Sequence, residues 1–598
     1  MFGKVLVANR GEIAVRIFRT LRELGIGSVA VYSEADRNAL HVAFADEAFA
    51  LGGLTAAESY LDVDKLLAAA RRAGAEAVHP GYGFLAENAS FASAVEAAGI
   101  VWIGPPPSAI ELMGSKTRAR QAMQAAGVPI IPGTTDPVGS AGEVVALGEQ
   151  IGYPLLIKAA AGGGGKGMKI VGSAAEAAQA FESAQREGQS YFSDATVYVE
   201  RYLADPRHVE VQVLADSHGN VIHLGERDCT IQRRHQKLVE ETPSPAVGPE
   251  LRDRIGRIAV DAARAAGYRS AGTIEELLSP EGDYFFMEMN TRIQVEHTVT
   301  ELVTGLDLIR EQVLIAAGEP LSLRQEDVVL RGHAIECRIN AEDPSNGFLP
   351  SPGRITSYRE PAGPGVRVDS GVRAGSEISG LYDPMIAKLI VHDTSRETAR
   401  RRMLRALGEF EIGGVPSLVG FHRALLSHPS FVAGETCHGL VESEELAEQA
   451  QRFSHQATNL APAPDGSLPP QATRPLETMA EVDGRRVTVR VLVPEPGYRE
   501  LARSRRERAA SGAGGAGTDA VVSPMQGTVL DVKVAAGDAV ETGHVICIVE
   551  AMKMENEVAA HRAGTVAHVS VAVGSAVTIG QKICVIESAE PAQPADSR

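Results

Sequence analysis

The chain has 598 residues, of which 44% are hydrophobic and 22% charged, and its formal net charge at pH 7 is −18. This length is enough for three or four domains, and no run reaches the roughly 18 apolar residues of a membrane span. The acidic balance excludes a general affinity for nucleic acid or anionic membranes, so an anionic ligand needs a locally basic pocket.

Cysteine usage and the start of the chain favour a cytoplasmic protein. The five cysteines are few, unclustered and odd in number, which indicates neither a disulfide framework nor a zinc site. Residues 1–7 enter a strand at once, without the pattern of a signal peptide. We therefore expect the protein in the cytoplasm.

The first hundred residues alternate strand and helix. Residues 5–8, 29–32, 77–79 and 101–104 have the composition of buried strands, and residues 11–24 form an amphipathic helix pattern. This order predicts an α/β unit with a parallel sheet. The first turn, Asn9-Arg10-Gly11-Glu12-Ile13, lacks the G-x-G-x-x-G pattern of a dinucleotide site. We expect this unit to be a scaffold for its neighbour.

A glycine run follows the strand predicted at residues 155–158. Residues 162–168 read Gly-Gly-Gly-Gly-Lys-Gly-Met, and glycines allow backbone N–H groups to approach phosphate closely. A P-loop is excluded, because Lys166 is followed by Gly167 and not by Ser or Thr. The run could be a flexible loop only. With Lys158 beside it and Lys116 upstream, a mobile lid over ATP explains it better.

An acidic strand is predicted at residues 284–292. Its period of two places Glu288, Asn290 and Arg292 on one face, and Gln294 and Glu296 continue that face if the chain stays extended. Glu275 could meet Glu288 from a neighbouring strand. Such groups are costly to bury without a ligand, and paired carboxylates beside phosphates indicate Mg²⁺. The alternative is a surface strand with salt bridges.

The composition changes after about residue 446. Residues 461–464 and 469–470 are proline-rich, residues 479–493 could form a hairpin around Asp483-Gly484, and residues 511–517 have the composition of a flexible tether. A basic stretch with five arginines at residues 499–508 is either a solvated run or a docking segment. The tail from residue 590 is rich in proline and alanine and is expected to be disordered.

Two copies of one pattern, 37 residues apart, occupy the C-terminal part. The pairs are Gly527 and Gly564, Gly537 and Gly574, Gly543 and Gly580, Cys547 and Cys584, and Glu550 and Glu587. Apolar residues alternate within each copy, as in half-buried strands. The repeat predicts a small pseudo-symmetric β-domain with Lys553 at the turn between its halves.

Two resemblances follow from these motifs. Lys553 lies in Ala551-Met552-Lys553-Met554, which resembles the attachment site of biotin carrier domains; the related lipoyl carriers have Asp and Ala around the lysine. Residues 1–446 resemble a biotin carboxylase of the ATP-grasp superfamily. The motifs that carry this resemblance are residues 8–14, 79–88, the glycine run, 226–237, 288–297 and 336–343.

The resemblance implies a role for each matching residue. Lys116, Lys158, Gly163, Gly164 and Gly165 would hold the ATP phosphates, and Glu200, Leu203, His208, Gln232 and His235 would border the rest of the nucleotide. Glu275, Glu288 and Asn290 would bind Mg²⁺ or Mn²⁺. Lys237, Arg292, Gln294 and the backbone of Val295 would hold bicarbonate, Glu296 would be the general base, and Arg338 would stabilise the enolate-like oxygen of biotin.

The resemblance also implies a domain order and partners. The expected parts are an N-terminal α/β domain (1–113), an ATP-grasp domain (114–327), a mixed α+β C-terminal carboxylase domain (328–446), a linker (447–519), an all-β flattened-barrel biotinyl domain (520–589) and a tail (590–598). The whole is similar to the α subunit of bacterial acyl-CoA carboxylases.

That similarity implies a biotin protein ligase that modifies Lys553, a separate carboxyltransferase β subunit, and a homo-oligomer within a hetero-oligomeric complex. The subunit-binding domain of larger α subunits is absent or reduced to the predicted hairpin, because only about 75 residues separate carboxylase and carrier. Two alternatives remain: the equivalent subunit of a two-subunit pyruvate carboxylase, and a carrier module with a degenerate ATP site.

Overall fold

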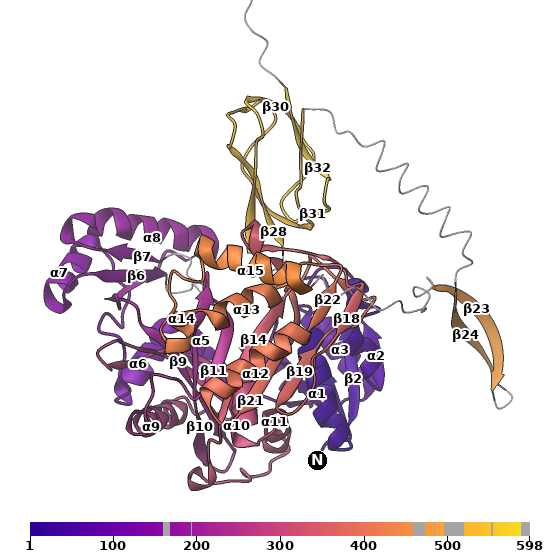
Figure 1. Ribbon diagram of the computed structural model, residues 1–598, viewed down its shortest axis with the longest axis horizontal. Coiled ribbons are helices and arrows are strands. Elements are labelled where there is room, and N and C mark those ends of the chain that lie inside the picture. The colour runs from indigo at the N-terminus through magenta and orange to yellow at the C-terminus, as the bar shows by residue number, and fades with distance from the viewer. Residues whose placement is uncertain are drawn as a thin grey trace, which may run out of the picture. The chain divides into compact units, whose positions relative to one another are not determined.

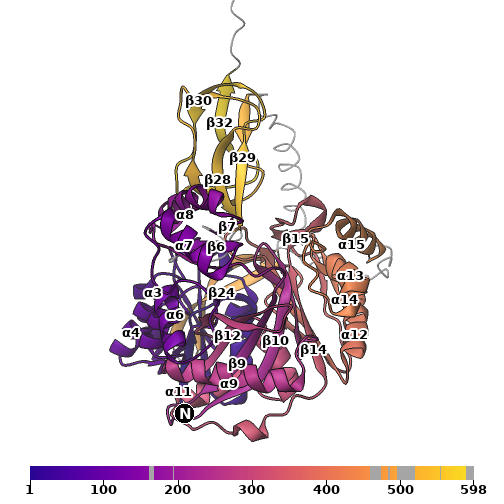
Figure 2. The ribbon, with the colours of Figure 1, turned by 90° about the vertical axis from the view of Figure 1, so that its left-hand side faces the viewer.

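The computed structural model describes residues 1–159, 168–192, 194–457, 473–482, 485–494, 519–551 and 554–587. They form two compact units, one with residues 1–379 and 384–457 and the other with residues 380–383 and the described residues beyond 457 (Figure 1, Figure 2). Among the described residues, we find no helix with the length and apolar character that crossing a membrane requires.

The chain begins with the predicted parallel sheet, whose strand order is β3-β2-β1-β4-β5. Its strands are β1 (Lys4–Val7), β2 (Gly27–Tyr32), β3 (Glu47–Ala50), β4 (Ala77–His79) and β5 (Val101–Trp102). Its helices are α1 (Gly11–Glu23), α2 (Leu40–Phe44), α3 (Val63–Ala73), α4 (Ala89–Ala97) and α5 (Pro107–Gly114). Val5, Leu6 and Val7 are fully buried, as expected of a parallel strand covered on both faces.

A small antiparallel sheet with the order β7-β6-β8 carries the segment that contains the glycine run. The elements here are α6 (Lys116–Ala125), α7 (Ala141–Ile151), β6 (Leu155–Ala159), β7 (Lys169–Val171), α8 (Ala177–Phe192) and β8 (Val197–Arg201). The Ser140 hydroxyl accepts a hydrogen bond from the backbone N–H of Glu143 and so caps α7. Residues 160–167, with Gly163, Gly164 and Gly165, lie outside the described residues.

An antiparallel sheet of eight strands forms the centre of the first unit, in the order β13-β12-β9-β10-β11-β14-β21-β19. Its strands are β9 (Arg207–Ala215), β10 (Val221–Arg233), β11 (Gln236–Thr242), β12 (Ser270–Leu278), β13 (Tyr284–Asn290), β14 (His333–Asn340), β19 (Val366–Ser370) and β21 (Met385–Asp393). Strand β11 pairs with β14, from Val239 opposite Cys337 to Thr242 opposite Ala334. The sheet therefore runs without a break across residue 327, where we expected a domain boundary.

Helices and short strand pairs complete this unit. The helices are α9 (Pro249–Ala265), α10 (His297–Thr304), α11 (Leu308–Ala316), α12 (Arg396–Glu409), α13 (Val419–Ser427), α14 (Pro429–Ala433) and α15 (Glu444–Ala457). The short strands are β15 (Glu342–Asp343) with β16 (Leu349–Pro350), β17 (Gly353–Arg354) with β20 (Glu377–Ile378), and β18 (Ser357–Arg359) with β22 (Glu411–Gly413). Helices α12 to α15 lie together in both views (Figure 1, Figure 2). Helix α15 contacts α13 and continues through residues 447–457, where we expected the linker.

Two apolar clusters join the layers of the first unit. One, which we call the rear core, lies between strands β9, β12 and β13 and helices α6 and α9, and it includes Val209, Ile274 and Phe286. The other joins α1 and the parallel sheet to α11 and the large sheet, for example through Phe18 and Val313. Both clusters place helices against sheet faces, which is the usual way in which α/β layers bury their apolar surfaces.

The predicted hairpin is present in the second unit. Strands β23 (Thr473–Val482) and β24 (Arg485–Pro494) pair antiparallel, with Val482 opposite Arg485, so only Asp483 and Gly484 separate them. The turn position agrees with the Asp-Gly signal, because glycine tolerates the positive φ that two-residue hairpin turns require.

The predicted C-terminal β-domain consists of two four-stranded sheets that exchange strands. Its strands are β25 (Ala520–Val522), β26 (Gly527–Val532), β27 (Ala539–Val540), β28 (Val545–Ala551), β29 (Met554–Ala559), β30 (Gly564–Val569), β31 (Ala576–Val577) and β32 (Lys582–Glu587). β27 of the first repeat pairs with β30, and β31 of the second repeat pairs with β26, so each half completes the sheet of the other. This arrangement confirms the predicted pseudo-symmetric β-domain. β28 pairs with β29, with Ala551 opposite Met554, and Met552 and Lys553 lie outside the described residues.

Candidate active site

Neighbouring strands of the large sheet bring three glutamates together, of which Glu210 and Glu275 are buried and Glu288 is half-buried. Glu275 on β12 lies opposite Glu210 on β9 and opposite Glu288 on β13. The predicted pairing of Glu275 with Glu288 is therefore confirmed. The strand itself is shorter than expected, because β13 ends at Asn290.

The predicted extension of that strand to Arg292 and beyond is wrong. Residues 291–296 form an irregular segment that leads into α10. Glu87 from the parallel-sheet domain accepts hydrogen bonds from the backbone N–H of Thr291 at 3.0 Å and from Nε of Arg292 at 2.9 Å. The hydrogen bonds from Glu87 hold residues 291 and 292, which pair with no neighbouring strand in the described part of the chain. Gln294 and Glu296 reach the site through this turn and not through strand periodicity.

Lys237 is the centre of the site. Its Nζ atom lies within hydrogen-bonding distance of Glu210 Oε2 (2.5 Å), Glu275 Oε1 (2.9 Å), Gln294 Oε1 (3.1 Å) and Glu296 Oε1 (2.6 Å), so its three N–H groups are shared among four acceptors. Burial alone would lower the pKa of this lysine, but the three carboxylates raise it well above its ordinary value. The side chain therefore stays charged and can hold an anion.

Arg338 also bonds Glu296, the candidate general base, but at Oε2, whereas Lys237 bonds Oε1. Its Nη2 lies 2.9 Å from Glu296 Oε2, and its Nε lies 2.6 Å from Glu240 Oε1. Burial alone would raise the pKa of Glu296, but Lys237, Arg338 and Arg227 hold it below its ordinary value. Burial, together with the neighbouring Glu336 and Glu296, raises the pKa of Glu240 to about 8 despite Arg338. Two adjacent carboxyls thus have opposite shifts, which is typical of a catalytic centre.

The expected metal ligands fit a hard divalent cation. Burial and the charge of Glu275 raise the pKa of Glu288, which is the repulsion that a cation between the two would relieve. Asn290, the third expected ligand, accepts a hydrogen bond from Arg292 Nη2 at 2.9 Å through its Oδ1. Its buried Nδ2 has no hydrogen-bond partner among the described residues. Asn290 thus contacts Arg292 in this structure, and Glu275 and Glu288 offer carboxylate oxygens for a cation; the role of Asn290 as a ligand stays a prediction.

The expected nucleotide residues lie around the small sheet and the start of the large one. Lys158 on β6 forms an ion pair with Glu200 on β8, which also contacts Arg120 at 3.2 Å. Burial and the charge of Lys158 lower the pKa of Lys116 at the start of α6, although Glu288 opposes this. Burial, together with Lys158, also lowers the pKa of His235.

His208 links this region to the expected metal ligand Glu275. Its Nε2 lies 3.0 Å from Glu275 Oε2, and its Nδ1 lies 3.1 Å from Nε2 of Gln232. Despite burial, the charge of Glu275 raises the pKa of this imidazole. Of these two predicted nucleotide residues, His208 contacts the predicted metal ligand Glu275, and Gln232 contacts His208.

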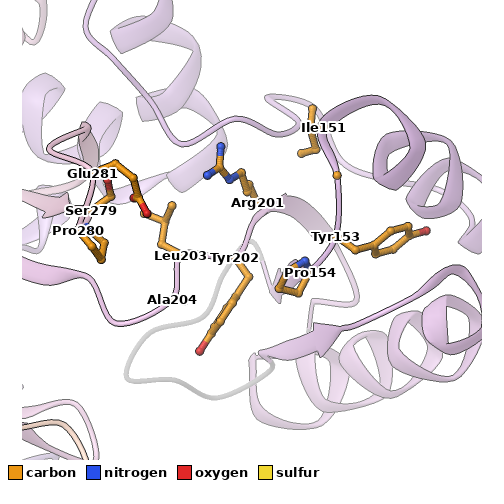
Figure 3. Close-up of a pocket in the computed structure, with 11 residues that line it drawn as sticks. Ile151, Tyr153, Pro154, Arg201, Tyr202, Leu203, Ala204, Ser279, Pro280 and Glu281 are labelled. Carbon is orange, nitrogen blue, oxygen red and sulfur yellow. The ribbon is translucent and has the colours of Figure 1, made fainter.

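A cavity of about 180 Å³ borders the segment that follows β8. Figure 3 shows its lining residues, which come from three chain segments. They are Ile151, Gly152, Tyr153, Pro154, Arg201, Tyr202, Leu203, Ala204, Ser279, Pro280 and Glu281. Leu203 is the predicted nucleotide residue among them, and the groups around Lys237 lie elsewhere.

Several residues of the site were not assigned a role from sequence. Glu87 and Arg227 lie inside the quoted motifs, and their position there was the available signal. Arg227 is fully buried and holds Glu210 Oε1 at 2.5 Å. Glu240 and Glu210 carry no local signal in the sequence. Lys388 stands alone in the apolar run 386–391, and a charged residue in such a run is a signal that could have been used.

Four stretches of the chain match known families. Residues 1–110 match the N-terminal domain of biotin carboxylase, 115–324 the ATP-binding domain of the carbamoyl-phosphate synthase L chain, 336–443 the biotin carboxylase C-terminal domain, and 519–586 a family described as biotin-requiring enzyme. A solved structure of the biotin carboxylase domain of Hydrogenobacter thermophilus 2-oxoglutarate carboxylase, in complex with MgADP, ADP and bicarbonate, is also similar. It has a TM-score of 0.71 and 47% identity, covering 74% of this chain and 99% of that one.

Curated relatives cover both parts of the chain. The biotin-dependent acyl-coenzyme A carboxylase alpha3 subunit of Mycobacterium leprae is 48% identical over 571 residues, which is 94% of each protein. One of the pyruvate carboxylase subunits of Methanothermobacter thermautotrophicus is 55% identical over 435 residues, which is 73% of this chain and 88% of the relative. With these matches and the described site, the chain belongs to the biotin-dependent carboxylases and joins a biotin carboxylase to its own biotin carrier domain.

Proposed function

We propose that the chain uses ATP and bicarbonate to carboxylate biotin carried on Lys553, and that a separate carboxyltransferase β subunit moves the carboxyl group to acetyl-CoA, propionyl-CoA or a longer acyl-CoA. The observation that carries the proposal is the buried arrangement in which Lys237 and Arg338 both bond Glu296. It supports carboxylation in particular because it places two cations, which can hold a small anion, against one carboxylate that can take a proton.

The nucleotide side of the reaction depends on charge and position. Lys116, Lys158 and Gly163, Gly164 and Gly165 would hold the phosphates, and Glu200, Leu203, His208, Gln232 and His235 would border the base and ribose. Glu275 and Glu288 would hold Mg²⁺ or Mn²⁺, which neutralises charge on the phosphate oxygens when bound. Cations placed in advance contribute most of the catalysis in phosphoryl transfer.

The proton transfer would depend on substrate binding. Bicarbonate, held by Lys237, Arg292, Gln294 and the N–H of Val295, competes with Glu296 for the ammonium group of Lys237. Loss of that contact removes part of the charge that keeps the pKa of Glu296 low, so the carboxylate becomes a stronger base when its substrate is in place. Glu296 then takes the bicarbonate proton while the bicarbonate oxygen attacks the γ-phosphorus, which gives carboxyphosphate and ADP.

The second step would use Arg338. Carboxyphosphate breaks into CO₂ and phosphate, and that phosphate can remove the proton from the ureido nitrogen of the acceptor. Arg338 has one guanidinium edge bonded to Glu240 and Glu296, and it would stabilise the negative charge that develops on the ureido oxygen. A closed glycine lid would keep water from the unstable intermediate.

The choice of acyl-CoA over pyruvate rests on how much of the chain each relative covers. The match to the acyl-coenzyme A carboxylase relative extends over 94% of this chain, whereas the match to the pyruvate carboxylase relative covers 73%. A carrier module with a degenerate ATP site is the less favoured alternative, because Lys237, Arg292, Glu296 and Arg338 are all present and grouped. The domain bounds, the biotin ligase, the homo-oligomer and the cytoplasmic location expected from sequence remain parts of the proposal.

The test is copurification with the native partner followed by assays with a panel of acyl-CoA substrates and pyruvate. We expect biotin- and bicarbonate-dependent ATP cleavage by the chain alone, and carboxylation of an acyl-CoA by the complex. Carboxylation of pyruvate only would move the protein to the alternative. No bicarbonate-dependent ATP cleavage at all would favour the carrier-module alternative.

A further inference from the structure

Lys388 is a charged residue in the interior of the first unit. It lies in the middle of β21, between Ala387 and Leu389, and its exposed fraction is 0%. A buried ammonium group costs several kcal/mol in lost hydration unless it is paired and hydrogen-bonded, so its partners indicate what the charge is for.

Those partners come from three separate parts of the fold. The Nζ atom donates to the backbone carbonyl oxygen of Val295 at 2.9 Å. It lies 3.4 Å from Glu12 Oε1 on α1 and 3.9 Å from Asp369 Oδ2 on β19. The ring of Tyr82 is also near, with its centroid 5.8 Å from Nζ. The carboxylates of Glu12 and Asp369 balance the charge of Lys388. The carbonyl of Val295 is the neutral group to which Lys388 donates its hydrogen bond.

The Val295 carbonyl lies at a point where regular structure gives no support. In a regular helical turn it would accept from the N–H of Val299, but that N–H donates to the carbonyl oxygen of Glu296 at 3.3 Å. The carbonyl oxygen of Gln294 is used by the N–H and the imidazole of His297. Lys388 therefore supplies the hydrogen bond that fixes the peptide between Val295 and Glu296.

The residues on both sides of Val295 contact Lys237. Gln294 Oε1 and Glu296 Oε1 lie 3.1 Å and 2.6 Å from its Nζ. Lys388 also lies opposite Arg338 in the pairing of β14 with β21. Strand β21 thus carries a buried cation next to Arg338 and next to the backbone of residues 294–296.

We propose that Lys388 is a positioning residue for bicarbonate binding. It holds the peptide of Val295 so that the side chains of Gln294 and Glu296 stay directed at the bicarbonate site. The inference rests on the proposed function, because it assumes that the 294–296 segment binds bicarbonate. Glu12 and Asp369 keep the lysine in place and link its position to α1 and β19. A misplacement of about 1 Å in such a segment can cost about 10²-fold in rate.

The test compares Lys388→Met with Arg367→Met in the full-length, biotinylated protein. Arg367 bonds Asp369 at 2.7 Å and Glu301 at 2.7 Å, so its loss disturbs the same charge network without touching residues 294–296. Bicarbonate-dependent ATP cleavage is measured with free biotin as a function of bicarbonate and of ATP, and unfolding temperatures are recorded alongside.

We expect Lys388→Met to raise the KM for bicarbonate or lower kcat by about 10- to 100-fold while the KM for ATP changes by less than about threefold. Lys388→Arg, which keeps a donor and the charge, should recover part of the loss. Arg367→Met should leave the bicarbonate KM within about twofold of wild type, even if the unfolding temperature falls.

Two results would overturn the inference: equal effects of Lys388→Met and Arg367→Met, or an unchanged bicarbonate KM and kcat in Lys388→Met. If Lys388→Met does not fold, the double variant Lys388→Met, Glu12→Gln removes the charge together with one counter-charge and is judged by the same ratio of KM values. If the wild type shows no bicarbonate-dependent ATP cleavage, the proposed function fails as well. An active wild type with an unaffected variant refutes the role of Lys388 alone.

Discussion

Replacing Glu276 by leucine should stabilise the first unit, and the gain should grow as the pH rises. Glu276 lies on β12 next to Glu275, the proposed metal ligand, but on the opposite face of the sheet, where its exposed fraction is 0%. Its cross-strand partners Val209 and Phe286 belong to the rear core. Neither carboxyl oxygen has a hydrogen-bond partner among the described residues. Burial therefore raises the pKa of this group well above its ordinary value.

The size of the effect follows from proton linkage. Above pH 4.5, the ordinary value for this side chain, the unfolded chain loses the proton while the folded protein keeps it. The wild type then loses about 1.4 kcal/mol of stability per pH unit until the pH reaches the raised folded-state pKa. Leucine does not titrate, and it removes an unpaired polar group whose burial costs about 1–3 kcal/mol. The gap between variant and wild type should therefore widen as the pH rises above 4.5, by up to about 1.4 kcal/mol per pH unit.

Urea unfolding at several pH values measures this gap. The single tryptophan, Trp102, is buried in the parallel sheet of the same unit, so its fluorescence reports the transition. Glu281→Gln is the matched control, because this glutamate follows the same strand on the surface. Its curve should follow that of the wild type. Parallel pH profiles for Glu276→Leu and wild type, or a destabilised variant at pH 7, would show that the carboxyl has a compensating partner.

Four further predictions concern function. Glu296→Gln should lower bicarbonate-dependent ATP cleavage by roughly 10²–10⁴-fold, since it removes the base, while Lys553 still accepts biotin; unchanged cleavage would place the base elsewhere. Lys553→Arg should abolish biotin attachment, seen by intact mass, and keep free-biotin carboxylation; an adduct on another lysine would contradict the carrier assignment. Glu87→Gln should raise the bicarbonate KM about tenfold or more by releasing Arg292, and an unchanged KM would count against that role. Replacing residues 511–517, which lie outside the described residues, by a stiff proline-rich segment should slow only acyl-CoA carboxylation in the assembled complex. If both rates survive, the hinge lies elsewhere, and the proline-rich 461–475 stretch is the next segment to replace.

Much of the local structure was predictable because its requirements are written into neighbouring residues. The repeat of the carrier domain is an example. A Cβ atom at Gly527 would lie 2.2 Å from the carbonyl oxygen of Glu550, and one at Gly564 would lie 2.2 Å from that of Glu587. Each repeat therefore needs glycine at the same place, and the 37-residue spacing predicts the two halves. The Asp-Gly hairpin and the strands at 77–79 and 155–158 were predictable for the same local reason.

The candidate site residues could be named from the motifs in which they lie. Their grouping in space could not be derived from the sequence. Lys237, Glu275 and Glu296 are far apart in the chain and meet only because β9 lies between β12 and β10 and because the turn after Asn290 is held by Glu87. The strand period predicted that residues 294 and 296 would continue the face of β13, and this was wrong because hydrogen bonds from another domain ended the strand.

The sequence alone determined the carrier repeat, the parallel sheet, the glycine segment and the family motifs, since these depend on periodicities and spacings among near neighbours. Only the tertiary structure decided that one sheet crosses residue 327, that Glu276 is buried without a partner among the described residues, and that Lys388 supports the segment before α10. These facts depend on strand order and on which charges share a buried space. Neither the strand order nor the pairing of buried charges can be read from local patterns. The sequence around a charged residue in an apolar run is the same whether or not the fold gives that residue a partner.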